Sequence, residues 1–152
     1  MRSLTHTLRL GEDVLLCHGS PRSDHEYLLE TLDGATVRAA TSTEIDERLS
    51  GQYAPLMACG HTHVPRQVRL GAGVLLVNPG SVGLPAFDDD HIAFHVHQTG
   101  SPHARYALCE SDASGRWSVA QIAVAYDWPA AAAQAARNGA ADWARWLATG
   151  LA

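Results

Sequence analysis

Two short apolar segments of this chain end in the same way, and they limit the folds that it can adopt. The segment "VLLC" (14–17) runs into His18, Gly19 and Pro21, and "PLMAC" (55–59) runs into "GHTHVP". Short apolar runs that stop at glycine and proline are typical of buried β-strands. Each strand therefore ends in a loop that carries histidine, and the two loops are candidates for one shared site.

The second loop carries two histidines, His61 and His63, separated by one residue. A strand places residues i and i+2 on the same side. If the backbone stays extended beyond Gly60, both imidazoles point the same way, which suits metal ligation. Together with His18, they could form a mononuclear zinc site with one open position, or part of a two-metal site that also needs carboxylates.

The other histidines are interpreted as surface or hydrogen-bonded residues. Three of them, His91, His95 and His97, fall on one face of an alternating segment. That face could hold a satellite metal site, but we expect an exposed sheet face instead. The two cysteines at the strand ends, Cys17 and Cys59, are interpreted as core residues, because a buried free cysteine behaves as a small apolar side chain.

The remaining pattern predicts a mixed α/β chain, α+β in character with much antiparallel pairing, that forms a single domain over residues 1–152. A capping residue and a closing glycine mark two early helices, the first capped by Ser23 or Asp24 and the second by Thr43. The predicted strands are 5–10, 13–17, 55–59, 66–70, 74–78, 91–97, 105–110 and 117–126, and the predicted helices are 24–32, 41–51, 129–139 and 142–150.

Composition excludes some partners. The net charge of −5 and the pI near 5.9 argue against binding to a phosphate backbone, so no nucleic acid partner is expected. No apolar run approaches the roughly 20 residues of a membrane helix, and the N-terminal segment lacks an apolar signal core. Three widely spaced cysteines do not form a disulfide framework. We expect a cytoplasmic protein without a membrane partner.

Three motifs in this order, "CHGSPR", "GHTHVP" and "NPGSVGLP", resemble the calcineurin-like metallophosphoesterases, in particular their small bacterial branch. The tail, "YDWPAAAAQAARNG" followed by "DWARWLATG", is similar to the C-terminal helices of that branch and places helices at about 129–150. The resemblance implies a two-sheet β-sandwich flanked by helices. It also implies a hydrolase acting on phosphate mono- or diesters at a dinuclear centre of divalent metals such as Mn, Fe, Ni or Zn.

The resemblance covers the later part of the family domain. Members usually begin with D-x-H, G-D and G-N-H-D or G-N-H-E motifs, and this sequence has none of them. We therefore expect the chain to be the C-terminal portion of such a domain. By the resemblance, His18 and His61 bind one metal and His63 the other, while the missing motifs supply the remaining ligands and the catalytic histidine. No catalytic residue is identified in this chain.

Two further residues are candidates near the site. Arg22 either contacts the substrate phosphate or is a solvated loop residue, and Asn78 either bonds the backbone or orients a ligand histidine. The "NPGSVG" segment is interpreted as a tight structural turn rather than an anion nest. Candidate acidic ligands are Asp24, Glu26 and the cluster 88–90.

Three functional hypotheses remain open. The first is a phosphoesterase that acts on a small phosphate ester, and the second is an inactive fragment that retains a partial three-histidine metal site. The third is a regulatory or interaction module. Because half of a sandwich leaves sheet edges exposed, we also expect a homodimer or poor solubility.

Overall fold

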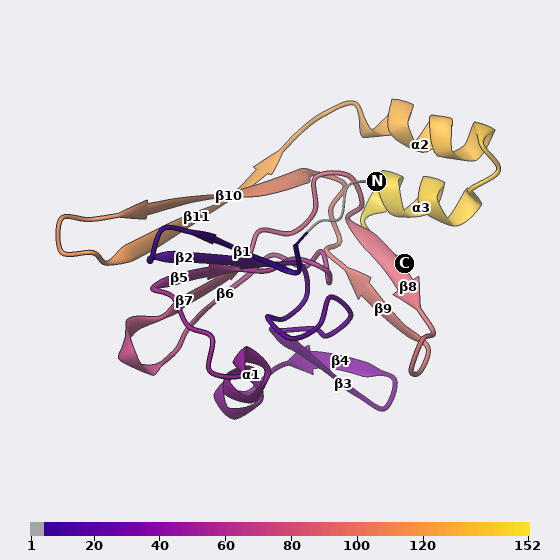
Figure 1. Cartoon of the computed structure of the whole chain (residues 1–152). Coiled ribbons are helices and arrows are strands. Elements are labelled where there is room, and N and C mark those ends of the chain that lie inside the picture. Colours follow the sequence, from indigo (N-terminus) through magenta and orange to yellow (C-terminus); the bar gives the residue numbers. More distant parts are fainter. Residues whose placement is uncertain (1–4) are drawn as a thin grey trace.

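The structure is a computed structural model that describes residues 5–152. A five-stranded sheet with the order β1-β2-β5-β7-β6 lies at its centre (Figure 1). Strands β2, β5 and β7 are parallel to one another, and β1 and β6 pair antiparallel at the two edges. The strands are β1 (Thr7–Leu10), β2 (Val14–Cys17), β5 (Leu56–Ala58), β6 (Arg66–Arg69) and β7 (Leu75–Asn78).

The parallel pairing of β2 and β5 brings the two histidine loops together. Leu16 pairs with Ala58, so both strands end at the same edge of the sheet. Beyond that edge, the Gly60 amide donates a hydrogen bond to the His18 carbonyl, with an N–O distance of 2.7 Å. Two motifs more than 40 residues apart in sequence thus become neighbours.

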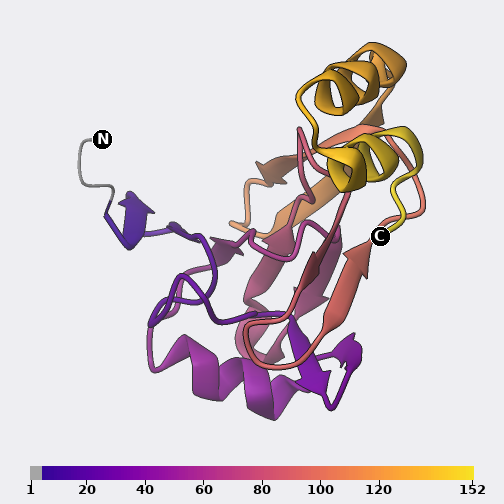
Figure 2. The same ribbon diagram turned by 90° about the vertical axis from the view of Figure 1, so that its right-hand side faces the viewer.

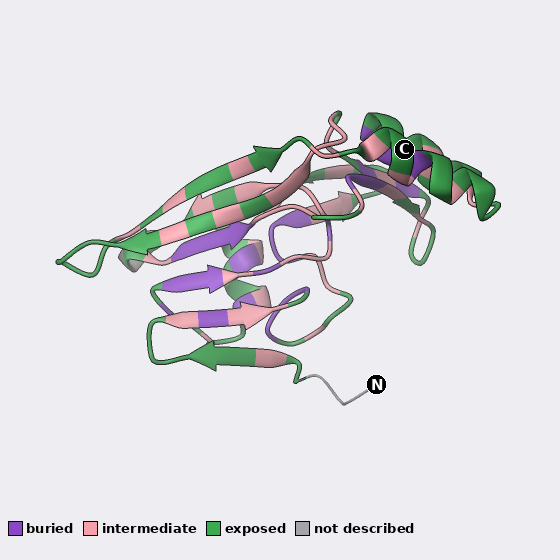
Figure 3. Ribbon diagram, turned by 90° about the horizontal axis from the view of Figure 1, so that it is seen from above, coloured by how far each residue is buried: buried purple, intermediate pink, exposed green. Residues whose placement is uncertain are grey.

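Successive side chains of the central strands point to opposite faces of the sheet and form two separate hydrophobic cores. Leu15, Met57 and Leu76 face α1 (Ser42–Leu49), which buries Ile45 and Leu49 against them. The residues that alternate with these face the hairpin of β10 (Ala104–Ser111) and β11 (Trp117–Val124), which lies over the other side of the sheet (Figure 1). Viewed from above, the purple buried segments are concentrated in the central strands, while much of the β10–β11 hairpin is exposed (Figure 3).

Two smaller hairpins and two helices complete residues 5–152. The helix α3 lies beside β8 and packs on α2, as both side views show (Figures 1 and 2). A 3-10 turn, η1 (Gly71–Gly73), joins β6 to β7. The remaining elements are β3 (Glu30–Asp33), β4 (Thr36–Ala39), β8 (Ala86–Asp89), β9 (His95–Gln98), α2 (Trp128–Arg137) and α3 (Ala141–Thr149).

The mixed α/β prediction is confirmed, and most predicted elements are present, but α1 begins at a different cap. Thr41, and not Thr43, accepts a hydrogen bond from the Glu44 amide, and the Glu44 carboxylate bonds the Thr41 amide in return. This reciprocal capping box satisfies two amides that a helix start leaves unpaired. Ser50, in the left-handed region with φ of 51°, ends the helix.

The predicted helix at 24–32 is wrong, because this segment is a loop that continues into β3. Arg48 of α1 gives the reason. Its guanidinium donates to the carbonyl oxygens of Tyr27, Leu28 and Glu30, at 3.0, 3.3 and 2.8 Å. In a helix over 24–32 the carbonyls of Tyr27 and Leu28 would accept from amides four residues on, and a tertiary contact holds them instead.

The predicted exposure of the strand at 91–97 is also wrong. The strand β9 begins only at His95, and His95 and His97 are buried while His91 is exposed. The apolar neighbours behave in the opposite way, because Ile92 and Phe94 are 83% and 63% exposed. The partner strand β8, which the sequence did not predict, pairs with β9, and its Phe87 ring stacks on that of His97 at 4.9 Å.

Candidate metal centre

The three predicted metal ligands lie at the carboxyl edge of the central sheet. His18 follows β2, and His61 and His63 follow β5. The ring centroids of His18 and His61 are 5.0 Å apart. His63 borders the same cavity as His61, and its ring packs edge-on against Phe87 at 5.0 Å. The first two predicted ligands are therefore adjacent, and the third lies on a shared surface with the second.

The backbone that carries His61 and His63 is not extended, so that expectation was wrong. Both residues lie in the left-handed region, with φ of 65° and 60°. Thr62 between them is buried, and its amide bonds the Gly60 carbonyl at 2.8 Å. A non-glycine residue in this region costs on the order of 1–3 kcal/mol and persists only where surrounding contacts hold it.

Asn78, at the end of β7, supplies those contacts. Its side-chain amide donates to the Gly60 carbonyl at 2.8 Å and to the Thr62 hydroxyl at 2.9 Å, and its oxygen accepts from the Gly80 amide at 2.9 Å. Asn78 is completely buried. It therefore fixes the histidine loop through that loop's backbone and Thr62.

The "NPGSVG" segment packs against the same loop. Gly80 has φ of 86°, and a Cβ built on it would lie 3.3 Å from the His63 carbonyl oxygen and 3.1 Å from the Arg105 Cβ. The Ser81 hydroxyl accepts from the Leu84 amide at 3.1 Å. The segment is thus a tight turn packed against the loop that carries His63, as its glycines indicate.

The protonation state of the loop histidines suits metal binding. Burial lowers the pKa of His61, and the nearby imidazoles of His18 and His25 lower it further. Burial also lowers the pKa of His63. Both rings are therefore neutral at neutral pH, the form that binds metal. The His63 Nδ1 is buried and has no hydrogen-bond partner among the described residues.

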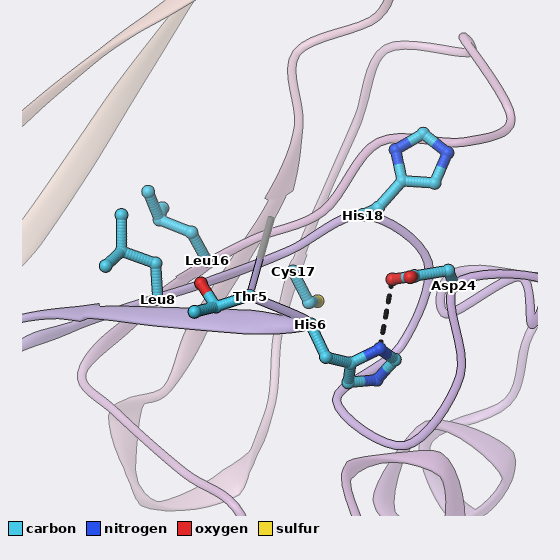
Figure 4. A pocket seen from close by; sticks show the side chains of 7 residues that line it. All are labelled: Thr5, His6, Leu8, Leu16, Cys17, His18 and Asp24. Carbon is cyan, nitrogen blue, oxygen red and sulfur yellow. Dashed lines mark ion pairs between the residues drawn. The ribbon is translucent and has the colours of Figure 1, made fainter. Parts of the chain in front are cut away.

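The carboxylates near the histidines are mostly engaged elsewhere. Asp24 pairs with the His6 Nδ1 at 3.1 Å, beside His18 in a cavity of about 340 Å³ (Figure 4). Asp89 accepts from the Tyr27 hydroxyl at 3.2 Å. Within residues 5–152, no three His, Cys, Asp or Glu side chains are grouped so that they could hold a metal ion. This holds for His18, His61 and His63 as well: they supply nitrogen donors at one edge of the sheet, but the three rings alone do not form a metal-binding group, and no carboxylate completes one.

Arg22 lies on the loop after His18, where its guanidinium is held by protein groups. Its Nε donates to Glu26 at 2.8 Å, and its Nη1 donates to the Glu47 carbonyl at 3.2 Å. This hydrogen bond from Arg22 lowers the pKa of Glu26, and the Ser20 hydroxyl adds to the effect. A role for Arg22 in binding phosphate stays a prediction, and such a role requires competition with Glu26.

The cysteines beside the histidines are unsuited to metal binding. Burial, with a smaller contribution from the charge of Asp24, raises the pKa of the Cys17 thiol to about 12. Burial raises the pKa of Cys59 as well. Since only a thiolate binds metal well, both side chains act as core residues.

A buried polar cluster next to His61 was missed from the sequence. The Tyr27 ring lies 4.9 Å from the ring of His61 and 4.7 Å from that of His97. The Tyr27 hydroxyl bonds the His95 Nε2 at 2.9 Å and also reaches Asp89. The alternation in the segment 91–97 did indicate that His95 and His97 share a face, but it does not show that this face is buried.

A buried ion pair lies close to this cluster. The Arg66 Nε donates to Glu30 Oε1 at 2.7 Å, and the Glu30 side chain is only 1% exposed. Both residues border a cavity of about 410 Å³ with His97. Arg66 is therefore engaged in supporting β3, since Glu30 is the first residue of that strand.

Comparisons with known proteins agree with the fold described above. A crystal structure of a metallophosphoesterase from Sphaerobacter thermophilus superposes with a TM-score of 0.68 and 24% identity, over 97% of this chain and 60% of that one. At this identity the likeness shows a shared fold, and the chain spans about 60% of the length of that protein. No curated protein sequence matches. None of the helices in residues 5–152 is both long and apolar enough to cross a membrane.

The sequence also matches a family model, the calcineurin-like phosphoesterase superfamily domain, over residues 3–101. This match includes the loops of His18, His61 and His63 and the turn after Asn78. Members of this family generally use divalent metals. Because the match spans more than half of the chain, the protein belongs to the calcineurin-like phosphoesterase superfamily.

Proposed function

We propose that this protein takes part in the hydrolysis of phosphate mono- or diesters at a centre of two divalent metal ions, for which it supplies His18, His61 and His63. The placement of all three histidines on loops at one edge of the sheet, with the rings of His18 and His61 5.0 Å apart, supports the proposal. Family membership supports phosphoesterase chemistry. Since the carboxylates of the described residues do not complete the centre, the remaining ligands come from other groups.

When bound, two divalent ions neutralise charge on the phosphate and make a coordinated water nucleophilic near neutral pH. This chain's contribution is to present neutral imidazoles in a fixed arrangement. Lowered pKa values keep His61 and His63 unprotonated, and Asn78 holds the loop that carries them. A fixed arrangement matters because a displacement of about 1 Å at a catalytic centre can cost roughly 100-fold in rate.

The test combines metal content with turnover. Purified protein is loaded with Mn²⁺ or Zn²⁺, analysed for bound metal, and assayed with 4-nitrophenyl phosphate and bis-4-nitrophenyl phosphate. We expect bound metal in the wild type and its loss, together with hydrolysis, in His61→Ala. His103→Ala is the matched control, because His103 contacts Ser101 and Trp128 and not the histidine loops. Equal hydrolysis by wild type and His61→Ala would rule out the proposal.

The lack of a complete ligand group favours a second function, an inactive or regulatory module that retains a partial metal site. In that case the wild type binds at most one metal ion, His61→Ala weakens that binding, and neither ester is hydrolysed. The same two measurements therefore separate the two functions.

A further inference from the structure

A cavity of about 360 Å³ opens directly beside the histidine loop. His61 and His63 form one part of its wall, and Phe87 of β8 and two tryptophans of α3, Trp143 and Trp146, form another. Such a volume is within the range of small-molecule sites, and an apolar wall with few polar groups is typical of them. The metal histidines and an aromatic surface thus face one space.

The two tryptophans offer different contacts. Trp143 is 50% exposed, so a ligand could stack on its ring. Trp146 is only 6% exposed, and its Nε1 has no hydrogen-bond partner in the part of the chain that the structure describes. Because that nitrogen is itself buried, Trp146 contributes apolar wall to the cavity and not a hydrogen bond. The ring centroids of the two residues are 6.5 Å apart, so one ligand could meet both.

We propose that this cavity binds the leaving group of the phosphate ester, and that this group is a planar aromatic ring. Trp143 stacks on the ring, and Phe87 and Trp146 form the apolar wall beside it. Asp88, exposed at the same cavity, accepts from a hydroxyl or amino substituent. The assignment rests on the proposed function, because only a phosphate held at His61 and His63 places its leaving group here.

Aromatic binding itself can be measured without turnover. The chain has four tryptophans, which give four indole N–H signals in a proton–nitrogen correlation spectrum. Metal-free protein is titrated with adenosine, with 4-nitrophenol, and with ribose as the non-aromatic control. We expect the Trp143 and Trp146 signals to move with an aromatic probe and not with ribose, while those of Trp117 and Trp128 stay in place. Tighter binding of adenosine would indicate a nucleobase as the leaving group, and tighter binding of 4-nitrophenol would indicate a simple aryl group.

Substitution tests the assignment to Trp143. We expect Trp143→Ala to weaken aromatic binding about tenfold, in line with the loss of one stacking contact, and Trp128→Ala to leave it unchanged. If no probe moves the α3 signals, if ribose moves them equally, or if Trp143→Ala binds as the wild type does, the aromatic site is refuted. A concentration-dependent shift of the Trp143 signal in free protein, abolished on dilution, would assign this surface to self-association and also refute the site.

Turnover then separates this inference from the proposed function. We expect Trp143→Ala to lower kcat/KM for 4-nitrophenyl phosphate about tenfold and to leave glycerol phosphate unaffected. Equal effects on both esters, in an enzyme that His61→Ala inactivates, would refute the leaving-group assignment alone. Aromatic binding without hydrolysis of either ester would refute both the proposed function and the assignment that rests on it.

Discussion

Asn78 is the residue whose removal most directly tests how the histidine loop is held. The substitution Asn78→Ala deletes three hydrogen bonds, to Gly60, Thr62 and Gly80, at 2.8–2.9 Å. The site is fully buried, so water cannot replace the lost partners. At about 1 kcal/mol for each bond, the expected loss in the free energy of unfolding is roughly 3 kcal/mol. That is a large part of the 5–15 kcal/mol typical of a domain.

Urea unfolding at neutral pH, followed by far-ultraviolet circular dichroism, measures this loss. Thr62→Val removes one of the three bonds and keeps the size of the side chain, so about 1 kcal/mol is expected. Asn138→Ala is the matched control, because Asn138 is exposed at the end of α2 and bonds only neighbouring groups of its own helix. A change within about 0.5 kcal/mol is expected there.

The result that would refute this reasoning is a loss below about 1 kcal/mol for Asn78→Ala. It would mean that His61 and His63 keep their left-handed backbone without the side chain of Asn78. A loss near 3 kcal/mol with unchanged metal affinity would instead limit Asn78 to stability, because we expect the freed loop to relax and bind metal less tightly.

Two further predictions concern the surroundings of the site. Gly19→Ala places a Cβ 2.7–2.8 Å from the carbonyl oxygens of Ser23, Asp24 and Glu26, so we expect the free energy of unfolding measured in urea to fall by about 2–3 kcal/mol. Gly83→Ala is the control, because its Cβ meets nothing within 4 Å. Equal stability of the two variants would contradict the close approach. Burial lowers the pKa of His97 from 6.5 to about 4, and the nearby imidazoles of His95, His61 and His63 lower it further, while the charge of Asp89 acts in the opposite direction. Between these pH values the unfolded chain binds a proton that the folded chain does not, so stability present above pH 6.5 falls by about 3 kcal/mol as the pH drops to 4. Metal-free His97→Phe should lose that part of the acid dependence in urea unfolding, and an unchanged pH profile would contradict it.

The sequence predicted the parts of the site that depend on local rules. Apolar runs stopped by glycine gave β2 and β5, and parallel pairing of such strands places their ends together. The register that places Leu16 opposite Ala58 depends on the tertiary structure, and the 5.0 Å distance between the rings of His18 and His61 depends on that register. The pattern could indicate a shared edge and could not give the distance.

The prediction failed where distant side chains override local preference. The segment 24–32 is rich in helix formers, yet Arg48 holds its carbonyls from another element. His95 and His97 alternate as an exposed face would, yet both are buried. Tyr27 packs against both rings, and Phe87 stacks on His97. Neither Arg48 nor Tyr27 is marked in the sequence as a tertiary contact.

These departures meet at one side chain. Tyr27 comes from the segment that is not a helix, its ring touches His61 of the strained loop, and its hydroxyl bonds His95 of the unexpectedly buried strand. Stretches where local rules and the fold disagree are expected at functional sites, since strain is retained there by surrounding contacts. Tyr27 links His61 to the cluster at β8 and β9, and the cavity beside α3 is lined by His61 and His63 together with Phe87 of β8. The left-handed backbone of His61 and His63 and the burial of His95 and His97 are costly for folding alone, so their grouping around His61 fits a functional role for this region.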